Sequence, residues 1–121
     1  MSQARILVVD DDDALRVLVR NQLEGAGYQL DEAKDGASAI EKLGLGEYDL
    51  MLLDINMPEK SGIDVLRFWK EKGLKCRVIM LTGRVGFSIA TESLKLGADE
   101  YITKPFSLEY LLSSIKRVLE K

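Results

Sequence analysis

Carboxylates follow two short apolar runs of this sequence, at the point where each run ends. Asp54 comes directly after residues 50–53, and Asp10 and Asp11 follow residues 6–9. Short apolar runs that end in acids are typical of buried parallel strands, whose carboxyl ends lie at one edge of a sheet. Carboxylates gathered there repel each other, and a hard divalent cation relieves that repulsion. We therefore expect these aspartates to bind Mg²⁺ and to present one oxygen of Asp54 beside it.

Two further polar side chains follow later apolar runs. Thr82 comes after residues 77–81, and Lys104 follows the next run and precedes Pro105. A threonine that ends a strand is often only a β-former, although its hydroxyl could donate to a phosphoryl oxygen, and Thr82 alone fits both interpretations. An ammonium near Asp54 would offset the charge of an incoming phosphoryl group. An X-Pro bond is the realistic place for a cis peptide, and a cis turn would aim Lys104 inward.

The four acids at positions 10–13 also fit the start of a helix. Aspartate is a favoured N-cap and interacts well with the positive end of the helix dipole. We expect Asp12 and Asp13 to serve that purpose. Because one helix needs one cap rather than four acids, Asp10 and Asp11 remain as candidates for the metal site.

Apolar runs alternate with amphipathic stretches along the whole chain, which predicts five strand-then-helix units. We expect strands near residues 5–9, 28–32, 49–53, 77–81 and 99–102, and helices near 13–25, 36–45, 62–72, 86–96 and 107–120. Such units form a parallel sheet with helices on both faces, and ligands bind outside the carboxyl ends of its strands. The candidate site residues therefore come from four strands but meet at one edge.

Length and composition indicate a single domain, residues 1–121. The net charge is −3 and the basic residues are scattered, which argues against direct nucleic acid binding. No apolar stretch approaches the about 20 residues that cross a bilayer, and no signal peptide precedes the first strand, so we expect a cytoplasmic protein. Cys76 is the single cysteine, for which we expect no chemical role, and the chain has no histidine.

In this order and spacing, the segments resemble the response regulator receiver domain of two-component signalling. The matching segments are residues 6–11, residues 49–58 with Gly62, residues 81–82 and residues 97–106. The resemblance covers essentially the whole chain. It implies an α/β flavodoxin-like fold, in which a single doubly wound five-stranded parallel sheet of order 2-1-3-4-5 is covered by five helices.

The resemblance also implies roles in phosphoryl transfer. Asp54 would be the phosphoacceptor and therefore the site of phosphorylation. Asp11, Asp54 and the backbone carbonyl of Asn56 would bind Mg²⁺, with Asp10 acting near the ion or through water. Lys104 would pair with Asp54 and then with the phosphoryl group.

Other positions would convey the signal. Thr82, which is grouped with Asp54 and Lys104 as catalytic, would form a switch pair with Tyr101, and the Lys104–Pro105 peptide would be cis. The sequence departs from the family pattern at Gly83, where a small residue such as alanine is commoner. Glycine leaves space for a phosphoryl group but loosens the backbone that positions Thr82.

The function implied is a phosphorylation-dependent switch. Because the chain has no histidine, the phosphoryl donor would be a sensor histidine kinase or a histidine phosphotransfer protein. Phosphorylation would change the surface of the fourth helix, fifth strand and fifth helix, and so control a partner, an output domain or a homodimer. The chain would assist its own phosphorylation and dephosphorylation without being a turnover enzyme. It fits a stand-alone receiver as well as part of a longer protein.

Three alternatives differ in class. A haloacid-dehalogenase-like phosphatase also uses a strand-end aspartate with Mg²⁺, but it needs a second aspartate where Asn56 stands. A flavodoxin-like cofactor binder needs a phosphate-binding loop after the first strand, where four acids would repel phosphate. A receiver-like module that acts only through protein contacts would not need a complete acidic site.

Overall fold

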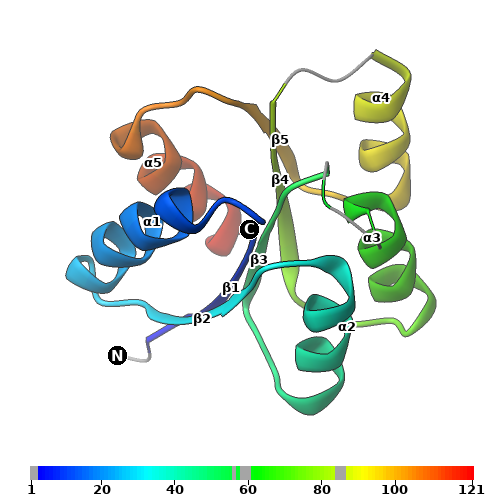
Figure 1. Cartoon of the computed structure of the whole chain (residues 1–121), viewed down its shortest axis with the longest axis horizontal. Helices are drawn as coiled ribbons and strands as arrows, with labels where there is room; N and C mark the ends of the chain where they lie inside the picture. The colour runs from blue at the N-terminus through cyan, green and yellow to red at the C-terminus, as the bar shows by residue number, and fades with distance from the viewer. Residues whose placement is uncertain (1–2, 56, 58–60, 84–86) are drawn as a thin grey trace.

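Strands and helices alternate along the chain in the computed structural model, which describes residues 3–55, 57, 61–83 and 87–121 (Figure 1). The side chains of Thr82 and residues 87–90 lie outside that description. The elements are β1 Arg5–Val9, α1 Asp13–Gly25, β2 Gln29–Ala33, α2 Gly36–Leu45, β3 Leu50–Leu53, α3 Gly62–Glu71, β4 Arg77–Thr82, α4 Phe87–Leu96, β5 Glu100–Thr103 and α5 Leu108–Leu119. The predicted boundaries agree to within one or two residues.

The five strands form one parallel sheet in the order β2-β1-β3-β4-β5, which confirms the predicted fold class. Val9 of β1 is in register with Ala33 of β2 and with Leu53 of β3. Thr82 is likewise in register with Thr103. Because paired strands end together, the residues that follow them emerge at the same edge of the sheet.

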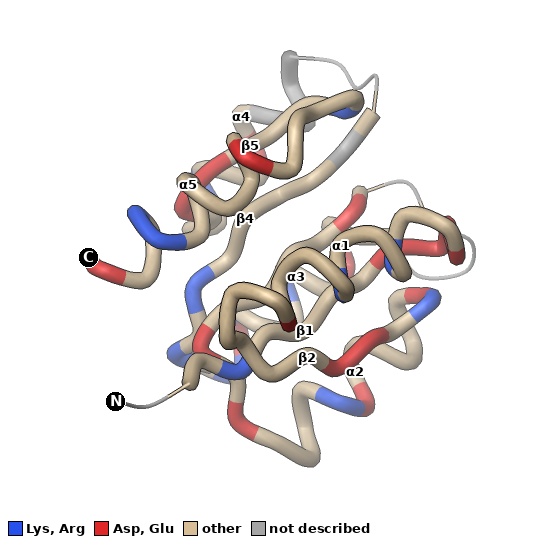
Figure 2. Tube along the Cα trace, turned by 90° about the vertical axis from the view of Figure 1, so that its left-hand side faces the viewer, with Lys and Arg blue, Asp and Glu red and all other residues tan. Residues whose placement is uncertain are grey.

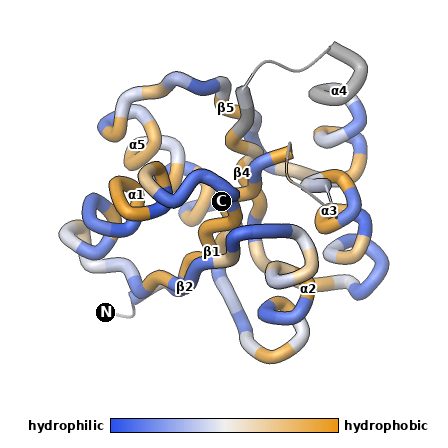
Figure 3. Tube along the Cα trace, in the orientation of Figure 1, coloured by the Kyte–Doolittle hydropathy of each residue, from blue (hydrophilic) through white to orange (hydrophobic). Residues whose placement is uncertain are grey.

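The helices cover both faces of the sheet, α1 and α5 on one face and α2, α3 and α4 on the other (Figure 1). Strand side chains alternate between the two faces, so Ile6 and Val8 join the core under α1 and α5, whereas Leu7 and Val9 join the other core. Figure 3 shows hydrophobic residues concentrated along the strands between the helix layers. Buried aliphatic packing on both sides makes the sheet a rigid support for its carboxyl edge.

Side chains cap the ends of the helices. Asp12 is the N-cap of α1, where its carboxylate accepts from the amide of Leu15 at 3.1 Å. Ser107 caps α5 by accepting from the amide of Tyr110 at 3.0 Å. Each such cap satisfies an amide that has no partner inside the helix. Among the helices of the described residues, none is long and apolar enough to span a membrane.

A tryptophan joins α3 to the end of α4. The ring nitrogen of Trp69 donates to the carbonyl oxygen of Cys76 at 3.0 Å. Its six-membered ring lies against Gly97, where a Cβ would approach Cη2 to 3.1 Å. Gly97 also has φ +116°, a backbone conformation that favours glycine. The turn after α4 therefore packs directly on the indole.

Candidate functional site

Three carboxylates meet at the carboxyl edge of the sheet. Asp10 and Asp11 follow β1, and Asp54 follows β3, the neighbouring strand. One oxygen of each lies within 4.8 Å of the others. Asp10 is 2% exposed and Asp54 is 4% exposed, whereas Asp11 is exposed to solvent. Burial strengthens the repulsion among these acids, because little water screens them.

Backbone packing fixes the position of Asp54. Its amide donates to the carbonyl of Val9 at 2.9 Å, which extends the β1–β3 pairing by one residue. After Asp54 in the chain, the carbonyl oxygen of Ile55 accepts from the amide of Gly62 at 2.9 Å. A Cβ at Gly62 would lie 2.2 Å from the carbonyl oxygen of Asp54, so only glycine permits this approach. The start of α3 therefore rests on the backbone that carries Asp54.

Every polar atom of Asp10 has a partner. Its amide donates to the carbonyl oxygen of Ala33 at 3.1 Å, and its own carbonyl oxygen accepts from Nη1 of Arg16 at 2.6 Å. Its Oδ1 accepts from the amide of Asp12 at 2.9 Å, and its Oδ2 accepts from Nζ of Lys104 at 2.6 Å. Both the backbone and the carboxylate of Asp10 are thus held by neighbouring groups. Each carboxylate oxygen still has lone-pair capacity for water or a metal ion.

Lys104 brings a positive charge from β5 across the sheet edge to these acids. The peptide between Lys104 and Pro105 is cis. Its Nζ lies 3.8 Å from Oδ2 of Asp54, but only 2.6 Å from Oδ2 of Asp10. The resemblance implied a pairing with Asp54, and the structure adds the shorter contact with Asp10. The lysine therefore interacts with both buried carboxylates.

The remaining predicted residues are described only in part. Asn56 lies outside the described residues, and so does the side chain of Thr82, whose backbone ends β4 at the same sheet edge. Tyr101 lies in β5 and packs against the core under α2, α3 and α4. Within the described chain its buried hydroxyl has no hydrogen-bond partner. Burial raises the pKa of the Tyr101 phenol above its ordinary value.

The donor atoms of the acidic cluster suit a hard divalent cation. Three carboxylates supply oxygen ligands, the kind that Mg²⁺ prefers, and they come from two adjacent strands that fix their separation. Within the described residues the cluster contains neither sulfur nor imidazole, which softer metals favour. Asp10, Asp11 and Asp54 therefore fit Mg²⁺.

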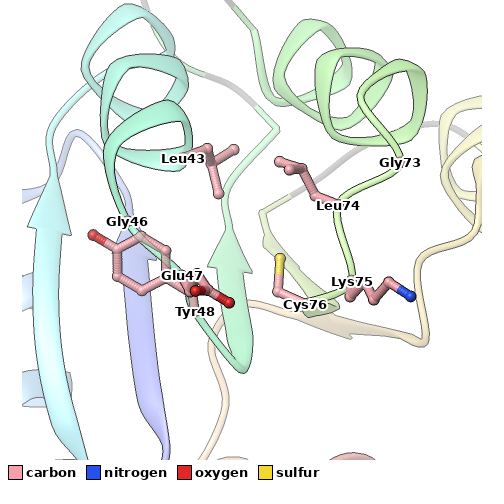
Figure 4. A pocket seen from close by; sticks show the side chains of 8 residues that line it. All are labelled: Leu43, Gly46, Glu47, Tyr48, Gly73, Leu74, Lys75 and Cys76. Atoms are coloured by element: carbon pink, nitrogen blue, oxygen red, sulfur yellow. The ribbon is translucent and has the colours of Figure 1, made fainter.

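A separate cavity of about 290 Å³ lies near the opposite edge of the sheet, between α2 and the loop after α3 (Figure 4). Leu43 and Leu74 face each other across it, and the sulfur of Cys76 points into it. Burial raises the pKa of the Cys76 thiol to about 11. The thiol is therefore protonated at neutral pH, which makes it a poor nucleophile.

Sequence reasoning assigned no structural role to two residues that support the site. Gly62 was named among the segments that match the family pattern, but its close contact with Asp54, where the structure leaves no room for a side chain, was not predicted. Arg16, which contacts the carbonyl of Asp10, was not singled out at all. A basic residue three positions after an acid on a helix, as with Asp13 and Arg16, is a common surface pattern, so the sequence carried no distinctive signal.

Comparison with known proteins agrees with this fold. A model of the response regulator receiver domain family matches residues 6–116. The chain is 41% identical over 112 residues to the transcriptional regulatory protein DltR of Streptococcus agalactiae, covering 93% of the chain and 50% of DltR. It is 38% identical over 117 residues to the response regulator MprA of Mycobacterium leprae, covering 97% of the chain and 51% of MprA.

Solved structures give the same result. A CheY-like response regulator receiver domain protein from Methanospirillum hungatei superposes with a TM-score of 0.93 at 34% identity, over 98% of this chain and 95% of that one. The chain belongs to the response regulator receiver domain family of two-component signalling. It spans about half the length of the curated relatives that it matches.

Proposed function

We propose that the chain is a phosphorylation-dependent switch that accepts a phosphoryl group on Asp54. The proposal is carried mainly by one observation, that Asp10, Asp11 and Asp54 present oxygens within 4.8 Å of one another beside the ammonium of Lys104. Membership of the receiver family supports it. Asp10, Asp11 and Asp54 would bind Mg²⁺, and the resemblance adds the carbonyl of Asn56.

The chemistry is a phosphoryl transfer between proteins. A carboxylate oxygen of Asp54 attacks phosphorus in line, the bond between phosphorus and the donor's histidine nitrogen breaks, and the imidazole leaves with the bonding electrons. The product is an acyl phosphate on Asp54. Mg²⁺, when bound, neutralises charge on the transferred group and on the carboxylates around it. Lys104 contributes a second positive charge that is already in place before transfer.

Hydrolysis of the acyl phosphate would reset the switch. In this proposal the chain assists its own phosphorylation and dephosphorylation but is not a turnover enzyme, because each phosphoryl group modifies Asp54 itself. The donor is a sensor histidine kinase or a histidine phosphotransfer protein, since the chain has no histidine. Val17 and Leu18 on α1, each 55% exposed, offer such a donor an apolar surface on the helix that begins at the acidic edge.

The switch would operate through β5. The Tyr101 hydroxyl, buried and without a partner in the described chain, can gain a hydrogen bond by moving. The resemblance pairs it with Thr82, whose hydroxyl would turn toward the phosphoryl oxygens. A shallow cavity of about 350 Å³ borders Tyr101 and the start of α5. Phosphorylation would shift the population of two states of the α4–β5–α5 surface and so change binding to a partner, an output domain or a second copy.

Labelling with a small donor tests the proposal directly. The purified chain is incubated with acetyl phosphate and Mg²⁺, and its intact mass is measured. We expect one added phosphoryl group that requires Mg²⁺ and is absent from Asp54→Ala. The control is Asp64→Ala, which removes a different carboxylate, in the first turn of α3. This variant should still be labelled. Unchanged labelling of Asp54→Ala would contradict the proposed site. In a separate assay, repeated hydrolysis of a phosphate ester by the purified chain would favour the phosphatase alternative.

A further inference from the structure

We propose that Arg16 is a positioning residue for the metal site, because its bond to the carbonyl of Asp10 fixes the peptide from which the carboxylate of Asp11 projects. This inference rests on the proposed function, since it concerns the Mg²⁺ that transfer to Asp54 would need. Arg16 touches neither Asp11 nor the reacting oxygen in any described contact, so it acts through the backbone.

The guanidinium of Arg16 joins three segments at the sheet edge. Its side chain is only 13% exposed, although it lies in the first turn of α1. Nη1 donates to the carbonyl of Asp10 at 2.6 Å, at the end of β1. Nε donates to Oε1 of Glu32 at 3.0 Å, near the end of β2, and Nη2 donates to the carboxylate of Asp13. One planar group therefore ties β1, β2 and α1 together beside the acids.

The position of this bond explains how it reaches Asp11. A peptide unit is planar, so the direction of the Asp10 carbonyl determines the plane that contains the nitrogen of Asp11. The amide on the other side of Asp10 is already held by Ala33. In the described part of the chain, the exposed carboxylate of Asp11 has no hydrogen bond from the protein. The backbone that Arg16 holds therefore sets the Cα–Cβ direction from which this carboxylate reaches the other two acids.

A positioning role and a purely electrostatic role predict opposite results. A guanidinium near a cation site repels the cation, so loss of its charge alone would strengthen Mg²⁺ binding. Loss of the bond to Asp10 would instead weaken Mg²⁺ binding, because the ligand Asp11 would no longer be preorganised. Lysine keeps the charge but cannot present several donors in one rigid plane. Arg16→Lys and Arg16→Met therefore separate the two roles.

The test is calorimetric titration of Mg²⁺ into the unphosphorylated chain. We expect the Mg²⁺ dissociation constant to rise about tenfold in both Arg16→Lys and Arg16→Met. The amide resonance of Asp11 should shift in both variants before any metal is added. Labelling by acetyl phosphate should slow at low Mg²⁺ and return to the wild-type rate at saturating Mg²⁺. This division between metal affinity and maximal rate would not arise from a general loss of structure.

Arg20 supplies the matched control. It lies one turn later on α1 and binds the other oxygen of Glu32 at 2.5 Å, but Asp10 is not among its described partners. Arg20→Met removes the same charge and should leave the Mg²⁺ dissociation constant unchanged. Wild-type affinity in Arg16→Lys, tighter binding in Arg16→Met, or equal weakening in Arg20→Met would each overturn the inference. If any of these results is found while the wild-type chain binds Mg²⁺ and is labelled, the Arg16 inference fails and the proposed function stands. If the wild-type chain neither binds Mg²⁺ nor is labelled, the Arg16 inference and the proposed function both fail.

Discussion

The ammonium of Lys104 lies 2.6 Å from Oδ2 of Asp10 and 3.8 Å from Oδ2 of Asp54. Both carboxylates are almost completely buried, so this single cation offsets much of the charge that β1 and β3 deliver to the sheet edge. The ammonium and a bound divalent cation would therefore both interact with the same two carboxylates. This relationship predicts that Lys104 opposes metal binding but favours phosphoryl transfer.

Replacement of Lys104 should separate these two effects. In Lys104→Met we expect Mg²⁺ to bind several-fold more tightly, because a like charge beside it is gone. Labelling by acetyl phosphate at saturating Mg²⁺ should slow by about 10- to 100-fold, because a preformed positive charge near the phosphoryl oxygens is lost. Calorimetry and intact mass measure the two quantities. Lys116→Met, an exposed lysine on α5, should change neither, and weaker Mg²⁺ binding in Lys104→Met would contradict the prediction.

Gly62 should tolerate no side chain. Gly62→Ala would place a Cβ 2.2 Å from the carbonyl oxygen of Asp54, so the backbone must move. We expect the free energy of unfolding to fall by about 3 kcal/mol or more, near the upper end for overpacking, because the Cβ is fixed rigidly to Cα and the oxygen that it meets belongs to the backbone. Gly44→Ala on α2, where a Cβ meets nothing within 4 Å, should raise it by about 0.5–1 kcal/mol. Urea unfolding followed by circular dichroism measures both, and equal stability of the two variants would refute the steric argument.

Acid should weaken the fold partly through β2. A hydrogen bond from Tyr48 lowers the pKa of Asp31. Burial raises the pKa of Glu32, but hydrogen bonds from Arg20 and Arg16 outweigh it and the net pKa is lowered. A carboxylate with a lowered folded-state pKa adds stability that is complete above its ordinary pKa and is lost as the pH falls toward the folded-state value.

We therefore expect the unfolding free energy to be nearly constant from neutral pH down to about 5 and to fall below about 4.5, where Glu32 of the unfolded chain is already about half protonated. Glu32→Gln should show a shallower decline in this range. Glu41→Gln, an exposed position on α2, serves as the control and should keep the wild-type slope. Urea midpoints between pH 3 and 7 provide the measurement. A steeper decline of stability with falling pH in Glu32→Gln would show that the Glu32 carboxylate does not stabilise the folded chain.

Cys76 should react slowly in the folded chain. Its thiol is 6% exposed and has a pKa of about 11, raised by burial. At pH 8 the thiolate fraction is about 100-fold lower than for a thiol of pKa 9, and we expect alkylation to be at least about 10-fold slower than for a free thiol. Urea should restore the normal rate. Rapid alkylation without denaturant would show that the cavity beside Leu43 and Leu74 admits reagents more freely than its burial indicates.

The sequence was sufficient for the fold because burial leaves a clear pattern. Strands buried on both faces, such as residues 50–53, produce uninterrupted apolar runs, and the acids that follow them indicate the functional edge. The preference of Lys104 for Asp10 could not be predicted, because it depends on differences of about an ångström between two neighbouring carboxylates. The contact of Gly62 with Asp54 was also inaccessible, since a glycine in a turn more often serves conformational freedom than close packing.

The position of Trp69 has a practical consequence. It is the single tryptophan of the sequence, and its ring packs on Gly97 at the end of α4 while its nitrogen is tethered to Cys76. Any displacement of α4 against α3 would alter the surroundings of this indole. The chain therefore contains its own fluorescent reporter, which could follow conformational exchange in real time without an attached dye.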